Sequence, residues 1–353
     1  MNVERVALVS AFVLLAACVV ATVLLVLTRV LKDRAERRRQ HARSSVWRVV
    51  LTLGSGEGQE LEDAYATLLD ATPAQRRAVE SDAFALLPKL RGESRQRLSE
   101  VLLAWGGLQR ATHSTTSRSV VRRCRGYYRL GVLAEPGRRD QVLSGLDDRD
   151  FIARRTAMLA LGSFPHPQVV EKMLDATVSE PRLRGDFLAS IDRIGPLAAP
   201  VLREHLALAL ASADEAGARR GQLAAEALGL VGAIDSVGAL EDALPVAPDE
   251  FRIACINALG SLGSPGSIIV LGDTLDHPNP DVRRAGAQGL GLIGAGHAVE
   301  LLTHALDDDN VEVARAAANA LHRCGRPGRW VLRGSPAPVA REVLALAGLG
   351  APG

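Results

Sequence analysis

The sequence predicts an all-α protein, a solenoid of stacked helical hairpins that follows a single transmembrane helix. Three observations support this prediction: a long uncharged segment near the N-terminus, a pattern that recurs at equal intervals along the chain, and a composition rich in Ala, Leu and Gly with only 3% aromatic residues. Small aliphatic side chains can fill the narrow spaces between closely packed helices, and a core of that kind grows by repetition.

Residues 1–28 are expected to form an N-terminal transmembrane anchor. The stretch "VALVSAFVLLAACVVATVLLVLT" at 6–28 contains no charge, and a helix of it spans roughly 34 Å, enough for a hydrocarbon core of about 30 Å. A basic juxtamembrane segment and linker follow at 29–57, with a charge balance of +6 over 29–48. Because positive residues flank the cytoplasmic end of such helices, we expect a single-pass plasma-membrane protein with its N-terminus outside and its solenoid in the cytoplasm.

Anionic lipid headgroups are the expected partner of the basic segment 29–48. The side chains expected at the membrane surface are Arg34, Arg37, Arg38 and Arg39. An alternative remains, because "LAAC" at 15–18 resembles the lipobox of bacterial lipoproteins, and acylation at Cys18 would export the rest of the chain. The apolar run continues past Cys18 into the arginines, whereas a cleaved signal is followed by polar mature protein. The uncleaved anchor is therefore favoured.

A repeat solenoid is predicted over 58–333, most regular over 119–333. Three similar stretches, "FRIACINALGSLGSPGS", "VRRAGAQGLGLIGAGHA" and "VARAAANALHRCGRPGR", start at the equally spaced positions 251, 282 and 313. Apolar positions recur at helical spacing within each stretch, and a second helical pattern and a polar turn follow. Each unit is therefore expected to be a helical hairpin, about eight of which fit between 60 and 332, with a C-terminal cap helix and tail at 334–353.

The signals for the start of a helix agree with these units. Asn279 can cap a helix, Pro280 suits its first turn, and Asp281 faces the positive end of its dipole. Asn310 takes the capping position one repeat later.

The stretch "NPDVRRAGAQGLGLIG" at 279–294 resembles the repeat of bacterial HEAT-repeat proteins of the phycobilin-lyase-like type. The resemblance covers roughly residues 120–333 well and 60–119 poorly. It implies a right-handed α-solenoid of HEAT-like helical hairpins. It is specific for the fold and unspecific for activity, because this fold serves mostly as a scaffold and only occasionally as an enzyme.

Residues 289–296, "GLGLIGAG", match the G-x-G-x-x-G fingerprint of dinucleotide-binding folds. That fingerprint needs a β-strand before its first glycine and a helix that opens at its third. A capped helix precedes Gly289 instead, and Gly291 and Gly294 belong to two series of glycines that recur at the interval of the repeat. We therefore predict that these glycines allow close helix approach and end helices, and we expect no small-molecule cofactor.

Four arginines that share one repeat position are the candidate partner-binding residues. They are Arg123, Arg154, Arg252 and Arg283. In stacked repeats they would form a ladder beside acidic residues such as Glu250 or Asp281 and bind repeat to repeat. The alternative is an anion-binding stripe on the concave face.

Charge is uneven along the predicted solenoid. Residues 118–155 contain ten arginines and five acids, whereas 233–312 contain thirteen acids and three arginines. This asymmetry suits oriented docking of a charged protein partner. Nucleic acid is not expected as a partner, because aromatic platforms for bases are scarce.

No catalytic or metal-binding residue is predicted. His297, Glu300 and His304 share one helix face and could bind a metal, but HEAT-fold hydroxylases hold iron through His-Glu dipeptides, and this sequence has none. We expect a membrane-anchored protein-interaction scaffold without enzymatic activity, and location alone suggests a membrane enzyme of envelope or polysaccharide synthesis as its partner. The alternatives are a lyase or isomerase of the phycobilin-lyase-like kind and, third, a nucleic-acid-binding protein.

Overall fold

The computed structural model describes residues 22, 24–30, 32, 34, 44–54, 58–212, 214–294 and 296–349. Those residues form α-helices, short 3-10 helices and turns, with no β-strand among them, so the all-α prediction is confirmed. Most of the expected transmembrane segment, including Cys18, lies outside the described residues, as do Arg37, Arg38 and Arg39. Residues 24–30 are helical and exposed.

The helices that build the two units of the fold have the following bounds. They are α2 (Gln59–Leu69), α3 (Pro73–Leu86), α4 (Gly92–Ala104), α5 (Gly107–Thr115), α6 (Val120–Leu133), α7 (Arg139–Leu143), η3 (Ser144–Asp147), α8 (Phe151–Leu161), α9 (Pro167–Ser179), α10 (Arg184–Ile194), α11 (Ala199–Ala211), α12 (Glu215–Leu230), α13 (Val237–Ala243), α14 (Asp249–Leu262), α15 (Ile268–Asp273), α16 (Pro280–Ile293), α17 (Ala298–His304), α18 (Val311–Arg323), α19 (Gly325–Gly334) and α20 (Pro338–Leu349).

The first unit runs to Ala111 and contains α2, α3, α4 and the helical residues 44–54. Its core is aliphatic and aromatic, and Leu68, Phe84 and Leu102 are buried in it. The indole Nε1 of Trp105 donates a hydrogen bond to the carbonyl oxygen of Leu68 at 2.9 Å. This bond satisfies the one polar group of a buried Trp.

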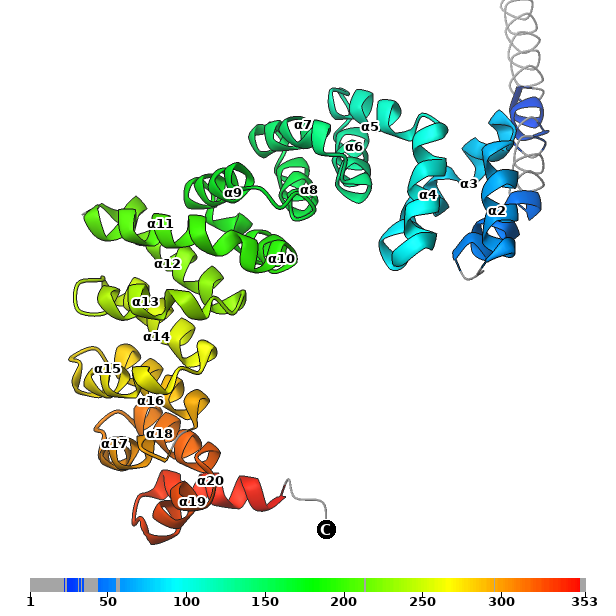
Figure 1. Ribbon diagram of the computed structural model, residues 1–353. Helices are drawn as coiled ribbons and strands as arrows, with labels where there is room; N and C mark the ends of the chain where they lie inside the picture. The colour runs from blue at the N-terminus through cyan, green and yellow to red at the C-terminus, as the bar shows by residue number, and fades with distance from the viewer. Residues whose placement is uncertain are drawn as a thin grey trace, which may run out of the picture. The chain divides into compact units, whose positions relative to one another are not determined.

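The second unit, Thr112–Gly353, is a solenoid of helical hairpins. In each hairpin an even-numbered helix from α6 to α18 is followed by a second helix, and successive hairpins stack in chain order (Figure 1). Extensive contacts join neighbouring first helices, such as α14 with α16 and α16 with α18, and also join α11 with α12. Helix α20 packs against α18 and α19 at the end of the stack.

One described segment, Pro181–Ala211, is long and apolar enough to cross a membrane. In the solenoid it comprises mainly α10 and α11. Phe187 of α10 and Leu202 and Leu206 of α11 are buried. The apolar side chains of this segment thus pack inside the solenoid.

Two glycine series have the two predicted structural roles. Gly263 and Gly294 end α14 and α16 with φ 67°, the left-handed conformation that glycine adopts without steric cost. Gly291 lies where α16 meets α18, and a Cβ added to it would lie 2.7 Å from Cα of Ala320. The G-x-G-x-x-G match at 289–294 is therefore made of helix-packing and helix-ending residues, as predicted.

The capping prediction is confirmed and allows a test. Asn310 Oδ1 accepts a hydrogen bond from the backbone N–H of Glu312 at 2.9 Å. We expect Asn310→Ala to lower the free energy of unfolding by about 1 kcal/mol, because one N–H of α18 loses its partner. Urea unfolding measures this, with the exposed mid-helix substitution Asn257→Ala as the control. Equal losses in the two variants would refute the capping role.

Candidate functional site

Arg123, near the start of α6, forms a buried bidentate ion pair with Asp148. Its Nε and Nη2 donate to Asp148 Oδ2 and Oδ1 at 2.7 and 2.8 Å. Its Nη1 donates to the carbonyl oxygens of Ser117 and Arg118 at 3.1 and 3.2 Å. The side chains of Arg123 and Asp148 are 7% and 4% exposed, so the pair is well shielded from water.

Arg283 of α16 repeats this arrangement five hairpins later. Its Nε and Nη2 donate to Asp308 at 2.7 and 2.9 Å, and its Nη1 donates to the carbonyl oxygen of His277 at 2.9 Å. Asp308 Oδ1 also accepts the backbone N–H of Asn310 at 2.8 Å. Each carboxylate therefore joins an arginine of one first helix to the turn that starts the next first helix.

The other two ladder arginines, Arg154 and Arg252, have partners of a different kind. Arg154 of α8 donates from Nε to Glu180 at 2.8 Å and from Nη1 to the carbonyl oxygen of Asp148 at 2.7 Å. Arg252 of α14 donates to the carbonyl oxygen of Leu244 at 2.7 Å and to Asp249 Oδ1 of its own helix at 2.9 Å, and His277 lies beside it at the position that Asp308 has beside Arg283. The carboxylate that holds Arg252 therefore comes from its own helix and not from the turn that follows the hairpin.

The acidic partners differ from those expected. Asp281 pairs with Arg284 at 2.8 Å. The ladder arginine Arg283 is held instead by Asp308, which follows it by 25 residues. Asp148 and Glu180 follow their arginines by 25 and 26 residues. The donors of Arg123, Arg154 and Arg283 are thus engaged by protein groups between repeats.

The ladder shifts the pKa of its carboxylates. Burial raises the pKa of Asp148, but hydrogen bonds from Arg123 and from the backbone N–H of Asp150 outweigh it, so the pKa falls below its ordinary value of 3.8. Hydrogen bonding by Arg283 lowers the pKa of Asp308 below the same value. In both cases the folded state favours the ionised carboxylate.

A pH dependence follows from Asp308. Because its folded pKa is lowered, its contribution to stability is fully present above pH 3.8 and is lost as the pH falls through the folded pKa. We expect the free energy of unfolding, measured in urea between pH 5 and pH 3, to fall less steeply with acid in Asp308→Asn than in the unsubstituted chain. An unchanged slope would show that this carboxylate does not gain its partner on folding.

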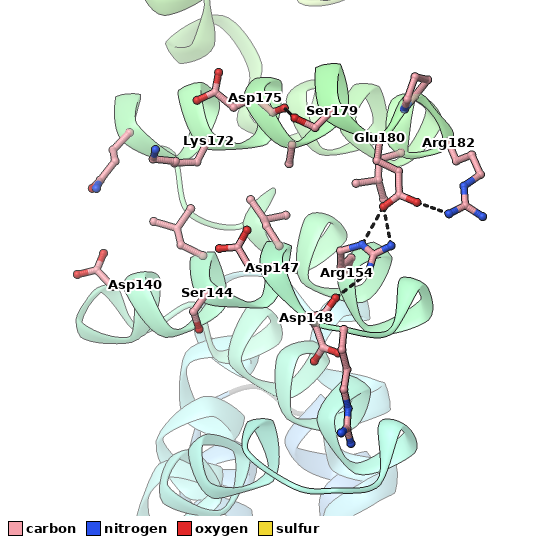
Figure 2. A pocket seen from close by; sticks show the side chains of 17 residues that line it. Asp140, Ser144, Asp147, Asp148, Arg154, Lys172, Asp175, Ser179, Glu180 and Arg182 are labelled. Carbon is pink, nitrogen blue, oxygen red and sulfur yellow. Dashed lines mark hydrogen bonds and ion pairs between the residues drawn. The ribbon is translucent and has the colours of Figure 1, made fainter.

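A groove of about 1110 Å³ lies between the second helices of two neighbouring hairpins, α7 with η3 on one side and α9 on the other (Figure 2). Arg154 lies at one end of the groove, where it joins Glu180 to the turn at Asp148. Leu143, Leu146 and Leu183 supply apolar surface within it. We call this hollow the α7–α9 groove.

The α7–α9 groove carries charges of both signs on its two sides. Asp140 and Asp147 lie on the α7 side, and Lys172 and Asp175 on the α9 side (Figure 2). Asp175 pairs with Arg220 at 2.6 Å and Asp140 with Arg139 at 3.0 Å. Asp147 and Lys172 are exposed, and neither has an ion pair within the described part of the chain. These two side chains are available to a partner.

Arg182 closes the end of the groove. Its guanidinium lies 4.2 Å from the ring centroid of Phe151, a cation–π distance, and it also pairs with Glu180. Glu180 thus holds both Arg154 and Arg182, which keeps this end of the α7–α9 groove in one arrangement (Figure 2).

The structure brings only part of the predicted site together. Arg154 lines the α7–α9 groove, and Arg123 reaches its edge through Asp148, whereas Arg252 and Arg283 lie in later hairpins. Arg34 is helical and exposed. His297, Glu300 and His304 are exposed along α17, and the described ranges contain no cluster of three metal-ligating side chains.

Sequence reasoning missed Asp147 and Lys172. The ladder acids could have been identified from a recurring offset, because Asp148 follows Arg123 and Asp308 follows Arg283 by the same number of positions. Asp147 recurs as Asp276 and Asp307 in later turns, but no repetition marks Lys172. The groove itself is formed where a short α7 faces a longer α9.

Comparison with known proteins supports the fold. A family model described as HEAT repeats matches residues 270–345. The solved structure of Kap121p bound to Ste12p is similar with a TM-score of 0.55 and 13% identity over 86% of this chain. The chain has a HEAT-like solenoid fold. It spans 40% of the length of Kap121p, and at this identity the likeness concerns the fold alone.

Two enzymes are also similar at a lower level. The phycocyanin lyase complex of CpcE and CpcF from Nostoc sp. PCC7120 has a TM-score of 0.36 and 20% identity, covering 64% of this chain and 92% of that one. Human deoxyhypusine hydroxylase has a TM-score of 0.31 and 20% identity, covering 80% and 97%. These TM-scores say nothing about activity in this chain. No curated protein matches it.

Proposed function

We propose that this chain is a membrane-anchored protein-interaction scaffold whose solenoid docks a protein partner at the plasma membrane. The observation that carries the proposal is the α7–α9 groove, an open hollow that offers apolar surface with an unpaired acid and an unpaired base, Asp147 and Lys172, among the residues that the structure describes. Charges of both signs around apolar surface suit a protein surface, whereas nucleic acid needs a basic one. Solved Kap121p structures with similar folds hold bound proteins, Ste12p and Ulp1p, which agrees with this use of the solenoid.

The membrane part of the proposal rests on the sequence. The uncharged stretch 6–28 would span the bilayer, and the basic segment 29–48, with Arg34, Arg37, Arg38 and Arg39, would attract anionic lipid headgroups. The solenoid would then lie in the cytoplasm.

Protease accessibility in spheroplasts tests this topology. We expect the solenoid to resist protease added outside and to be digested after the membrane is permeabilised. Digestion from outside in intact spheroplasts would contradict the cytoplasmic placement and favour export with acylation at Cys18.

Crosslinking in native membranes tests the scaffold itself. We expect a specific protein to copurify with the full-length chain, and Lys172→Glu combined with Asp147→Lys to reduce its recovery at least tenfold, because both groove charges are reversed. The matched control is Asp192→Lys on α10, an exposed charge reversal away from the groove.

Three results would contradict the proposal. Recovery of no specific partner would remove its basis, and equal recovery from all variants would exclude the α7–α9 groove. A copurifying chromophore or metal would favour a lyase or isomerase instead.

A further inference from the structure

Three side-chain amides lie at one repeat position on the first helices of three successive hairpins. Asn257, Gln288 and Asn319 are equally spaced in the sequence, lie on α14, α16 and α18, and are all exposed. A hollow of about 420 Å³ lies among them, lined also by Leu292, Ala316, Ala320 and Arg323. We call this surface the amide face.

The amide face is hollow because small side chains lie between the amides. Ala316 and Ala320 of α18 line the hollow. Helix α16 lies so close to α18 at Gly291 that a Cβ added there would lie 2.7 Å from the Cα of Ala320. The longer side chains of Gln288 and Asn319 therefore border a shallow hollow with a floor made of helix surface.

The amides keep hydrogen-bonding capacity for a ligand. Asn319 Nδ2 donates to the carbonyl oxygen of Arg315 at 3.0 Å, which leaves its Oδ1 as an acceptor. Asn257 and Gln288 have no side-chain hydrogen bond within the described ranges. A side-chain amide both donates and accepts, as a peptide group does, so each can pair with a backbone N–H and C=O.

The spacing of the amides matches an extended chain. Packed helices lie about 8–10 Å apart, and an extended peptide rises about 3.3 Å per residue. Amides on adjacent first helices therefore meet every third residue of a peptide that crosses α14, α16 and α18. Recognition of this kind reads the main chain and tolerates varied side chains.

Two neighbours of the amides add side-chain preference. Arg323 is exposed and forms no ion pair with the described part of the chain, whereas Arg284 pairs with Asp281 and Arg315 with Glu312. Leu292 is 52% exposed beside the amides. A segment that fits this surface would therefore present a carboxylate to Arg323 and an apolar side chain to Leu292.

We propose that the amide face binds an extended segment of a partner protein, with the three amides on its main chain, Arg323 on one carboxylate of the segment and Leu292 on an apolar side chain. This rests on the proposed function as a protein-interaction scaffold and names the kind of segment that it holds. Nucleic acid is disfavoured at this face, since no aromatic residue lines the hollow in the described part of the chain and Arg323 is its one basic lining residue there.

The test begins with a random dodecapeptide library selected on the full-length chain in detergent. We expect enriched peptides to share one acidic and one apolar position and little else. For a selected peptide, combined Asn257→Ala, Gln288→Ala and Asn319→Ala should weaken binding about a hundredfold in fluorescence anisotropy, since each neutral hydrogen bond contributes about fivefold. Gln109→Ala on α5, an exposed amide that lines neither the amide face nor the α7–α9 groove, is the matched control and should leave binding unchanged.

Two further measurements separate main-chain from side-chain recognition. Methylation of peptide nitrogens at every third position should abolish binding in one register and spare it in another. Arg323→Glu should weaken binding at least tenfold, and replacing the peptide's acid by lysine should restore it.

Several results would overturn the inference. Failure to enrich any peptide, binding unchanged by the triple alanine variant while its thermal unfolding is normal, or tighter binding of single-stranded DNA at this face would each do so. The peptide assay needs no native partner, whereas the scaffold test needs one. Peptide binding without a recovered partner therefore contradicts the scaffold alone, and a partner recovered equally by the triple variant contradicts only the amide face.

Discussion

Replacing Asp148 by alanine is expected to lower the free energy of unfolding by about 3–5 kcal/mol, because it leaves the buried Arg123 guanidinium without its carboxylate. The backbone N–H of Asp150, which donates to Asp148 at 2.9 Å, also loses its acceptor at the start of α8. Urea denaturation of the full-length chain measures the loss.

Two comparisons make this prediction specific. Asp140→Ala, in the partly exposed pair with Arg139, should change stability by less than about 0.5 kcal/mol. The double substitution Arg123→Leu with Asp148→Leu should cost less than Asp148→Ala alone, since no unpaired charge remains. If Asp148→Ala is no more costly than Asp140→Ala, the buried pair does not join these hairpins in the way described.

Adding one methyl group at Gly291 is expected to destabilise the solenoid, whereas adding one at Gly289 is not. A Cβ at Gly291 would lie 2.7 Å from Cα of Ala320, so α16 and α18 must move apart, at a cost of about 1–3 kcal/mol. A Cβ at Gly289 would meet its nearest atoms at 3.4 Å, an ordinary contact. Alanine at that helical position also gains about 1 kcal/mol of helix propensity.

Thermal unfolding of Gly291→Ala and Gly289→Ala measures this difference. The two glycines belong to the same G-x-G-x-x-G match, so a nucleotide site would make both substitutions harmful to ligand binding and neither specifically harmful to packing. Equal stability of the two variants would contradict the packing role of Gly291.

Much of the solenoid could be predicted because its information is local and repeated. Asn279 and Asn310 cap helices through their own side chains, and Gly263 and Gly294 end helices through their own backbone conformation. Each of these features depends on a few neighbouring residues and recurs at a fixed period, so it is visible in the printed sequence.

The ladder partners and the groove depend on tertiary packing. Asp281 lies close to Arg283 in sequence, but the helix directs it to Arg284, and the carboxylate of Asp308 reaches Arg283 across the hairpin. The space between α7 and α9 follows from their unequal lengths and from how two hairpins stack. The amide face is periodic in sequence, yet its hollow forms only when α14, α16 and α18 pack side by side.

A photo-crosslinking side chain at position 168, in native membranes, tests most directly whether the solenoid binds a protein. With the probe in place of Gln168, an exposed and uncharged residue of α9 that lines the α7–α9 groove, we expect one discrete adduct with a single protein, and no such adduct with the same probe in place of Asp192 on α10. Equal labelling from both positions, or no adduct from position 168, would contradict docking in this groove.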